Sequence, residues 1–312
     1  MEPIKTLTDQ LTAYLAHAES LRQSRHTIRN ARYHVQGFID WLEKSHAVTT
    51  ADRLQSTLLE NWQKHLAGHR THRGLPLKPT SLNKQIESLK GFLKYLAGHG
   101  IIPQALTEKL EYVKEPRLLP ASVLDHAEMK TVLKSANTND GQGYRDRAMM
   151  EMLYSSGIRA SELLGLNVAD VDLANATAIV LGKGNKQRVV PIGKTALRLL
   201  ESYIRAVRPF QAHDPQQPAL FITRRGDRLP YHTLLRLVHQ YATKENLGVN
   251  VTPHTFRRSC TTELIRGGAN LYHVKELLGH ESLETLRHYT RLTIDDLKKT
   301  HEKCHPRERG EG

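Results

Sequence analysis

Residues 177–192 read TAIVLGKGNKQRVVPI and interrupt a chain whose apolar residues otherwise recur at helical spacing. Two β-branched runs, 177–181 and 188–192, flank the segment 182–186, which contains two glycines. Such runs joined by a short glycine-rich turn are typical of a β-hairpin. The stretch therefore predicts a mainly α-helical fold with one small antiparallel β-sheet, and it places Lys183 near the tip of the turn.

Helical periodicity dominates on both sides of this hairpin. Asp125 followed by Glu128 resembles a capping box and predicts a helix start, and another helix is expected over about 144–156, with a stop at Gly157. Downstream of the hairpin, the spacing of apolar residues predicts helices near 195–207, 231–246, 254–266, 271–278 and 283–290. The second half of the chain is therefore mostly α.

The first hundred residues carry four amphipathic stripes, and each stripe marks the buried face of one helix. The stripes consist of Leu7, Leu11, Tyr14 and Leu15; Ile28, Ala31, Val35, Phe38, Ile39 and Leu42; Leu54, Leu58, Leu59, Trp62 and Leu66; and Leu82, Ile86, Leu89, Phe92, Leu93 and Leu96. Together they predict a small bundle. The segment 114–120 holds two prolines without periodicity, so it predicts a linker between an N-terminal domain, residues 1–113, and a second domain, residues 121–312.

The charge balance favours a polyanionic partner. The chain has 45 Lys and Arg against 32 Asp and Glu, a net charge of +13, which points first to nucleic acid. No apolar run approaches the ~18 residues of a membrane-spanning helix, and no apolar signal-peptide core is present, so we expect a cytoplasmic protein without a membrane partner. Basic residues decorate the N-terminal helices, where either a solvated surface or phosphate contact would explain them: Arg22, Arg25, Arg29, Arg32, Lys78, Lys84, Lys90 and Lys94.

Two segments of the second half are candidates for binding an anion. The stretch 252–258 opens a helix, and the three-residue step from His254 to Arg257 puts both side chains on one face, where they can bind one anion together. Arg159 lies where one helix stops and the next begins, a turn with unpaired backbone donors. Each pattern alone is common, so only the combination of the two indicates an anion site.

Two further residues follow near the carboxyl end. His280 comes directly after Gly279, which predicts the end of a helix. Tyr289 follows nine positions later. Cys260 and Cys304 lack the spacing of a zinc site or a disulfide framework, so no role is expected for either of them.

With these motifs in order, nearly the whole chain resembles the tyrosine recombinase family, also called phage integrases, and in particular its Xer-type bacterial members. The resemblance implies a four-helix N-terminal core-binding (SAM-like) domain and a mostly α catalytic domain with a small antiparallel sheet. The chain departs from the usual pattern at Arg258, where many relatives have histidine, and at 285–286, where two threonines are common. The motifs that carry the resemblance are 157–163, 182–188, 252–258, 278–280 and 286–290.

The resemblance implies a catalytic set consisting of Arg159, Lys183, His254, Arg257, His280 and the nucleophile Tyr289. Breaking a phosphodiester without a metal requires cationic donors around the five-coordinate phosphorus, and two arginine forks suit its nonbridging oxygens. Tyr289 must lose its proton during attack, and His254 is the candidate base. The family role of general acid for the leaving 5′ oxygen falls on Lys183.

The implied function is site-specific DNA recombination through a 3′-phosphotyrosyl intermediate, in integration, excision or resolution. The expected partners are a double-stranded DNA target site and either three further copies, as a tetramer on synapsed DNA, or a paired related recombinase in the nucleoid. Because the phosphotyrosyl bond stores the energy of the broken bond, we expect no ATP, no other cofactor and no metal. A type IB topoisomerase-like enzyme and a noncatalytic DNA-binding or architectural protein remain alternatives.

Overall fold

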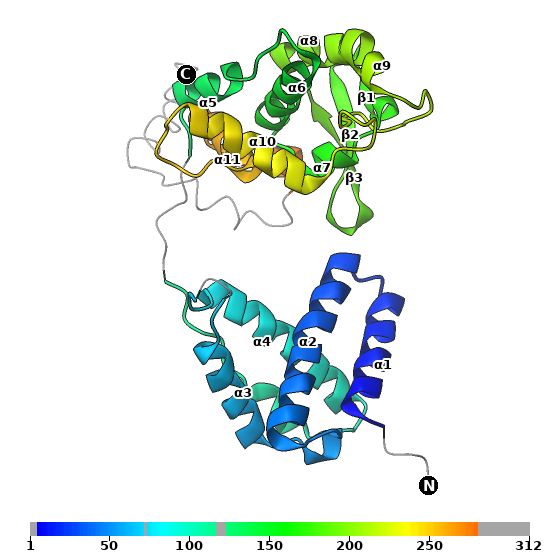
Figure 1. Cartoon of the computed structure of the whole chain (residues 1–312), viewed down its shortest axis with the longest axis vertical. Helices are drawn as coiled ribbons and strands as arrows, with labels where there is room; N and C mark the ends of the chain where they lie inside the picture. Colours follow the sequence, from blue (N-terminus) through cyan, green and yellow to red (C-terminus); the bar gives the residue numbers. More distant parts are fainter. Residues whose placement is uncertain (1–4, 72–73, 117–122, 280–312) are drawn as a thin grey trace, which may run out of the picture. The chain divides into compact units, whose positions relative to one another are not determined.

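The computed structural model describes residues 5–71, 74–116 and 123–279. By their internal contacts, residues 1–118 and 119–312 form two separate units (Figure 1). Each unit has its own cluster of buried apolar side chains. The domain limits expected from the sequence, 1–113 and 121–312, stay a prediction, and part of the expected linker lies outside the described residues.

The N-terminal unit is built from the four expected helices. All four stripes face its core, and α1 begins with a capping box in which Thr6 and Asp9 bond each other's backbone. One residue of the third stripe lies outside its helix: Leu54 is buried but precedes the helix, which begins at Ser56. The helices are α1 (Leu7–Ser20), α2 (Arg25–His46), α3 (Ser56–Gly68) and α4 (Pro79–Gly98), with 3-10 turns at Ala51–Arg53 and Gln104–Glu108.

Aromatic side chains join α2 to α3. The rings of Trp41 and Trp62 lie 5.3 Å apart, and Phe38 meets Trp62 edge-on at 5.4 Å. Aromatic pairs in such tilted arrangements add to the stabilisation that comes from burying their area. The two tryptophans therefore form one contact inside the N-terminal unit.

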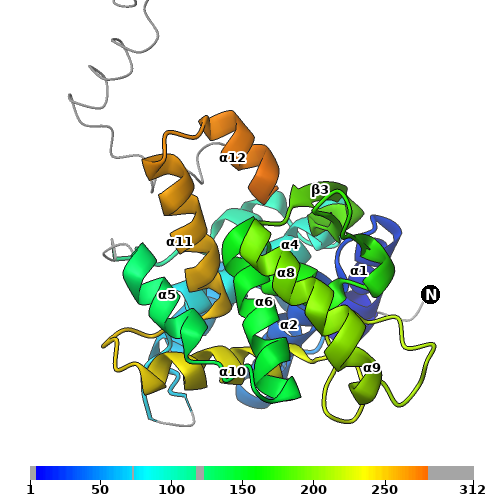
Figure 2. The same ribbon diagram turned by 90° about the horizontal axis from the view of Figure 1, so that it is seen from above.

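Helix α6 (Gly141–Ser156) lies in the middle of the C-terminal unit (Figure 2). This helix buries residues on all sides, as expected for a helix in the middle of a core, and it packs against α5, α8 and α11 (Figure 2). The capping box of Asp125 and Glu128 at the start of α5 is confirmed. The helices are α5 (His126–Lys134), α6 (Gly141–Ser156), α7 (Ala160–Gly165), α8 (Lys194–Ser202), α9 (Arg208–Gln211), α10 (Tyr231–Lys244), α11 (Pro253–Arg266) and α12 (Leu271–Leu278).

A three-stranded antiparallel sheet in the order β1-β2-β3 contains the expected hairpin. Val180 pairs with Arg188 across the hairpin, so both side chains share one face of the sheet. The buried residues Ala178 and Val190 belong to the same face. The strands are β1 (Val171–Asp172), which was not expected from the sequence, β2 (Thr177–Leu181) and β3 (Gln187–Pro191).

The helix expected over 195–207 is divided in the structure. Helix α8 ends at Ser202, a π-helical turn covers Tyr203–Val207, and α9 continues from Arg208. Pro209 has no N–H to offer the preceding turn, so regular α-helical bonding cannot continue through this region. The proline explains why the apolar periodicity overestimated the length of the regular helix.

A buried polar network connects α6 to α10. Asp146 accepts hydrogen bonds from Arg145 at 2.6 Å and from the Tyr241 hydroxyl at 2.8 Å, and Arg145 also donates to the carbonyl of Ile222. Burial raises the pKa of Asp146, while Arg145 and Tyr241 oppose that rise. The carboxyl group therefore depends on its hydrogen-bond donors.

Replacing Tyr241 with phenylalanine is expected to destabilise the chain by about 1–3 kcal/mol, because one buried acceptor loses its partner. Urea unfolding of the variant and the wild type measures this loss. Tyr231→Phe is the control, because Tyr231 lies on the same helix with 55% of its surface exposed. Equal unfolding midpoints for both variants would show that the Tyr241 hydroxyl does not support the network.

Candidate active site

Arg159 occupies the junction of α6 and α7. Helix α6 ends at Gly157, whose φ of 63° is a left-handed conformation that glycine adopts easily, and a Cβ there would lie 2.7 Å from Leu278. Arg159 then caps α7, and its backbone N–H donates to Glu162 Oε2 at 2.8 Å. Its side chain remains 36% exposed, so a ligand can reach it.

His254 and Arg257 lie on the first turns of α11. Arg257 is only 3% exposed, and its Nη1 donates to the carbonyl oxygen of Gly157 at 2.9 Å. This bond ties the start of α11 to the end of α6. The guanidinium group is thereby held in a defined position, as expected for preorganised charge stabilisation.

Arg159 and Arg257 meet at the carboxyl end of α12. Arg257 Nη2 donates to the carbonyl oxygen of Leu278 at 2.8 Å, and Arg159 Nη1 reaches the same oxygen at 3.4 Å. Arg159 Nη2 donates to the carbonyl oxygen of Gly279 at 3.1 Å. The last carbonyls of a helix carry partial negative charge, so they attract these cations. Two guanidinium groups from distant segments thus lie side by side.

His254 is exposed at the amino end of α11, yet its surroundings change its titration. The partial burial of its ring lowers its pKa, and the positive charges of Arg257, Arg258 and Arg159 lower it further. The neutral imidazole is therefore favoured near pH 7. A neutral imidazole can accept a proton, as a general base must.

The remaining three expected site residues are described in part or not at all. The backbone of Lys183 lies in the turn Lys183–Asn185 between β2 and β3, as expected, whereas its side chain is not among those described. Helix α12 ends at Leu278 with Gly279 as its left-handed cap, which confirms the expected glycine stop. His280, Tyr289 and the helix expected over 283–290 lie outside the described residues.

Glu162 belongs to the same cluster, and the sequence reasoning gave it no role. Glu162 is 4% exposed, and its carboxylate accepts hydrogen bonds from Arg159 and Arg188. Burial alone would raise its pKa, but the bonds from Arg188 and Arg159 outweigh burial and hold the pKa below its usual value. Its position three residues after the helix cap was the available signal, because acids at this position bond the cap's backbone.

Arg188 is the second residue that the sequence reasoning missed. It donates from Nη1 and Nη2 to the two oxygens of Glu162, at 2.9 and 2.8 Å, and from Nε to the carbonyl oxygen of Leu277 at 2.9 Å. The alternation of the strand was the available signal, because it places this cation on the same face as the buried Val190. A charged residue on a buried face needs hydrogen-bond acceptors, because burial removes its hydration.

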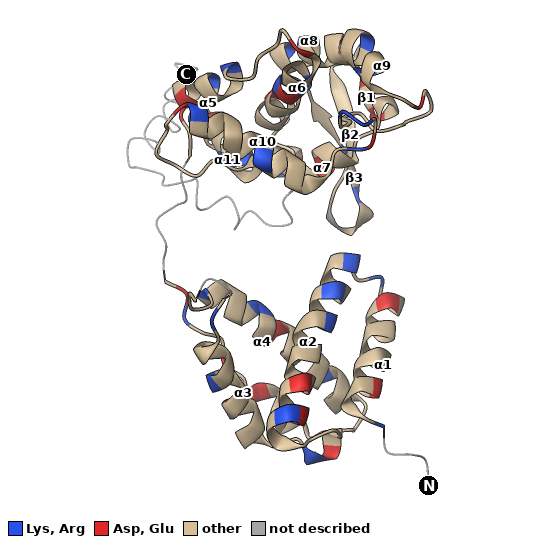
Figure 3. Ribbon diagram, in the orientation of Figure 1, with Lys and Arg blue, Asp and Glu red and all other residues tan. Residues whose placement is uncertain are grey.

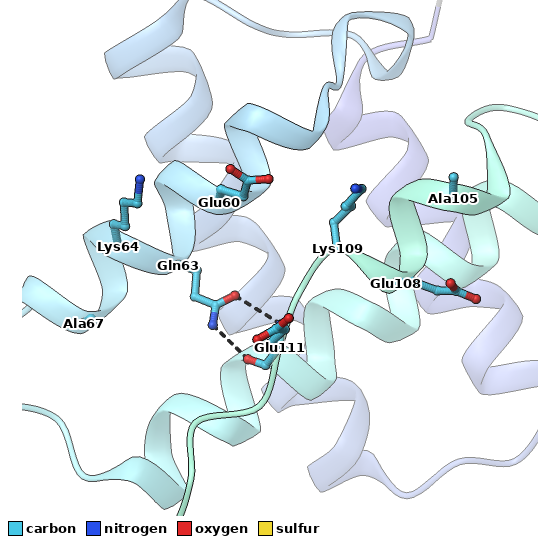
Figure 4. A pocket seen from close by; sticks show the side chains of 8 residues that line it. All are labelled: Glu60, Gln63, Lys64, Ala67, Ala105, Glu108, Lys109 and Glu111. Atoms are coloured by element: carbon cyan, nitrogen blue, oxygen red, sulfur yellow. Dashed lines mark hydrogen bonds between the residues drawn. The ribbon is translucent and has the colours of Figure 1, made fainter.

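A cavity of about 780 Å³ in the N-terminal unit differs from this arginine cluster in the charge of its lining (Figure 4). Glu60, Glu108 and Glu111 line it together with Lys64 and Lys109, so its walls carry both signs of charge. Gln63 binds the backbone of Glu111 beside the cavity through two hydrogen bonds. A wall with more carboxylates than ammonium groups does not suit a phosphate backbone.

Two features that would indicate other classes of protein are absent from the described residues. Within residues 5–71, 74–116 and 123–279, no three His, Cys, Asp or Glu side chains are grouped so that they could hold a metal ion. In the same ranges, no helix combines the length and the apolar composition that crossing a bilayer requires. The expected lack of a metal and of other cofactors stays a prediction.

Comparisons with known proteins agree on the family. The model of the phage integrase family matches residues 122–295, and the model of the phage integrase N-terminal SAM-like domain matches residues 9–100. Tyrosine recombinase XerC of Myxococcus xanthus is 32% identical over 306 residues, which cover 97% of this chain and 99% of the relative. Tyrosine recombinase XerD of Staphylococcus epidermidis is 32% identical over 284 residues, 91% of this chain and 94% of the relative.

A solved structure shares the fold. The XerH site-specific recombinase bound to its difH substrate, in a pre-cleavage complex, superimposes with a TM-score of 0.66 at 22% identity, over 88% of this chain and 78% of that chain. The mainly α fold with its small antiparallel sheet is therefore confirmed. The family matches, together with the near full-length similarity to two recombinases, show that this chain belongs to the phage integrase family and is a tyrosine recombinase.

Proposed function

We propose that this chain is a site-specific recombinase that cuts and rejoins double-stranded DNA through a 3′-phosphotyrosyl bond to Tyr289. One observation carries the proposal: Arg159 and Arg257, from distant parts of the sequence, share the carbonyl oxygen of Leu278 as a hydrogen-bond acceptor. Two guanidinium groups so close together form a site for an anion. The structures of XerH with its difH substrate before cleavage and of the Tn1549 transposon integrase in complex with transposon right end DNA support a phosphodiester as that anion.

The proposed reaction needs only side chains of the chain and the DNA. The Tyr289 oxygen attacks the scissile phosphorus, and His254, neutral because of its lowered pKa, takes the phenolic proton. Arg159 and Arg257 bind the nonbridging oxygens, and His280 adds a donor. Lys183 gives a proton to the 5′ oxygen as its bond to phosphorus breaks. Attack by a 5′ hydroxyl of another strand reverses these steps and joins the strands.

The assignment of His254 as the base predicts an acid limb in the pH dependence of cleavage. Only the unprotonated ring accepts a proton, and the pKa of this ring is shifted below its usual value of 6.5. The rate of covalent adduct formation should therefore stay level from neutral pH to below 6.5 and fall only at more acidic pH. His254→Gln should lower the rate by ~10²- to 10⁴-fold and remove this limb. An unchanged limb in the variant would assign the titration to another group.

DNA contact by the N-terminal unit is proposed for the amino-terminal half of α2. Figure 3 shows Lys and Arg along this half, whereas the other half carries two acidic residues together with Lys44. The basic residues of the amino-terminal half are Arg25, Arg29 and Arg32, and the acidic ones are Asp40 and Glu43. Three cations along one half of a helix can neutralise several phosphates and position the protein on its substrate.

A triple variant in which Arg25, Arg29 and Arg32 are all changed to alanine should bind DNA more weakly at every sequence tested. Its binding should also depend less on salt. Loss of three phosphate contacts lowers the slope of log affinity against log salt by about 2 to 3. Titration of a labelled duplex at several salt concentrations measures the slope. Lys64→Ala with Lys109→Ala, on the mixed-charge cavity wall, is the control. A slope equal to that of the wild type in the triple variant would exclude this half of α2 from the DNA interface.

The proposed function is tested by capturing the adduct. The protein is incubated with sheared chromosomal DNA of the organism that encodes it, denatured, and freed of unbound DNA. Sequencing of the retained ends should give one recurrent site, and mass spectrometry after nuclease digestion should find the nucleotide on the peptide that contains Tyr289. Protein that retains no DNA after denaturation, but binds DNA in a native gel, would contradict the proposed function and favour a noncatalytic DNA-binding protein instead.

We further propose that recombination requires a tetramer on two synapsed sites, formed by this chain alone or with a paired related recombinase, in the nucleoid of the cytoplasm. The similarity to both a XerC and a XerD supports such pairing. Two duplexes carrying the mapped site should yield exchanged strands. Relaxation of supercoiled DNA by a monomer, without strand exchange, would instead favour the topoisomerase-like alternative.

A further inference from the structure

Arg188 is a charged side chain on the buried face of the hairpin. Its cross-strand partner Val180 and its neighbour Val190 are fully buried, and the Arg188 side chain is 15% exposed. Removing a guanidinium group from water is costly unless hydrogen-bond acceptors compensate for the lost hydration. The hydrogen-bond acceptors of Arg188 therefore indicate which groups this side chain holds in place.

The first acceptor connects Arg188 to Arg159. Arg188 forms two parallel hydrogen bonds with the carboxylate of Glu162, and the same carboxylate accepts from the backbone N–H and from Nη1 of Arg159 at 2.8 and 2.9 Å. Parallel bonds of this kind define the orientation of both partners. Arg188 thus holds the carboxylate that orients Arg159.

The second acceptor connects Arg188 to the end of α12, which packs against β3 (Figure 2). Arg188 Nε donates to the carbonyl oxygen of Leu277, and the next two carbonyls accept from Arg257 and Arg159. Gly279 has a φ of 63°, and a Cβ on it would come within 3.0 Å of the Arg188 guanidinium group. The end of α12, which leads into His280, therefore rests directly on Arg188.

We infer that Arg188 is a positioning residue for DNA cleavage: it holds Arg159, through Glu162, and the end of α12 in one arrangement with the hairpin that carries Lys183. The inference rests on the proposed function. It assigns Arg188 no contact with DNA. A lysine cannot replace it, because one ammonium group cannot reproduce the parallel pair of bonds to Glu162 together with the bond to Leu277.

The test uses nicked duplexes with the mapped site, on which the adduct accumulates in a single turnover. Arg188→Lys should slow adduct formation by ~10- to 100-fold, as loss of a residue that orients a catalytic group typically does. Arg147→Lys is the matched control, because the Arg147 side chain is also 15% exposed and pairs with Glu151 through Nε and Nη2. DNA affinity and thermal unfolding should change to the same small extent in both variants.

A second measurement separates positioning through Glu162 from a general effect on the fold. Arg188→Lys is combined with Glu162→Gln, and the rates of adduct formation of the two single variants and the double variant are compared. If Arg188 acts through Glu162, its replacement costs much less in the Glu162→Gln background than in the wild type. Equal costs in both backgrounds would overturn the inference.

The possible outcomes are distinguishable. A wild-type rate in Arg188→Lys overturns the inference and leaves the proposed function intact. Unfolding of Arg188→Lys under conditions in which Arg147→Lys is folded assigns Arg188 to stability alone and also overturns it. A wild-type protein that forms no adduct overturns the proposed function, and the inference with it. A slow, folded Arg188→Lys with unchanged DNA affinity and non-additive coupling to Glu162→Gln supports it.

Discussion

Tyr289→Phe should form no detectable covalent adduct with DNA while it still binds the mapped site. Phenylalanine keeps the ring but lacks the oxygen that would attack phosphorus, so the covalent step cannot begin. Binding depends on basic side chains elsewhere and should remain dependent on salt. Denaturing electrophoresis of a labelled nicked duplex shows the adduct, and a native gel of the same sample shows binding.

Tyr272→Phe is the control for this variant. Tyr272 lies on α12 and is 64% exposed, so its hydroxyl should be dispensable. The adduct should form at the wild-type rate in the control. An adduct that persists in Tyr289→Phe would assign the nucleophile to another residue. It would contradict the assignment of Tyr289 that the family resemblance implies.

Arg257→Lys is expected to reduce the rate of adduct formation by ~10²- to 10³-fold, the typical loss when one preorganised donor is removed from a developing charge. In the structure, the two Nη atoms of Arg257 reach the carbonyl oxygens of Gly157 and Leu278. A lysine keeps the charge but presents a single nitrogen, so it cannot reproduce this geometry. Single-turnover kinetics at saturating protein isolates the chemical step from binding.

Arg266→Lys serves as the control for this second variant, since Arg266 ends the same helix with an exposed ion pair to Glu263. Thermal unfolding is followed in both variants, because Arg257 is buried and also holds the ends of two helices. A stably folded Arg257→Lys that cleaves at the wild-type rate would remove Arg257 from the proposed catalytic set.

Local patterns were sufficient for most of the fold. The spacing of apolar residues predicted the four N-terminal helices, and the β-branched runs around 182–186 predicted the hairpin. Strand β1 was missed because two residues carry no periodicity and pair only through the sheet. The π-helical turn before α9 was missed because apolar spacing does not register a missing N–H at Pro209.

Local sequence signals likewise predicted only part of the candidate site. The positions of Arg159, His254 and Arg257 at helix starts could be predicted from cap and spacing signals. Their meeting point could not, because the acceptors are backbone carbonyls of Leu278 and Gly279, and every residue has such a carbonyl. The role of Glu162 was within reach of the sequence, whereas the contact between Arg188 and Leu277 depends on how a strand packs against a helix.

The pair of tryptophans between α2 and α3 has a practical consequence for studying the chain. The sequence has two tryptophans, Trp41 and Trp62, and both belong to the N-terminal unit. Fluorescence excited selectively in the indole rings therefore reports only on that unit, while circular dichroism sums the helices of both. A denaturant titration followed by the two signals shows whether the SAM-like part and the catalytic part melt together or in turn.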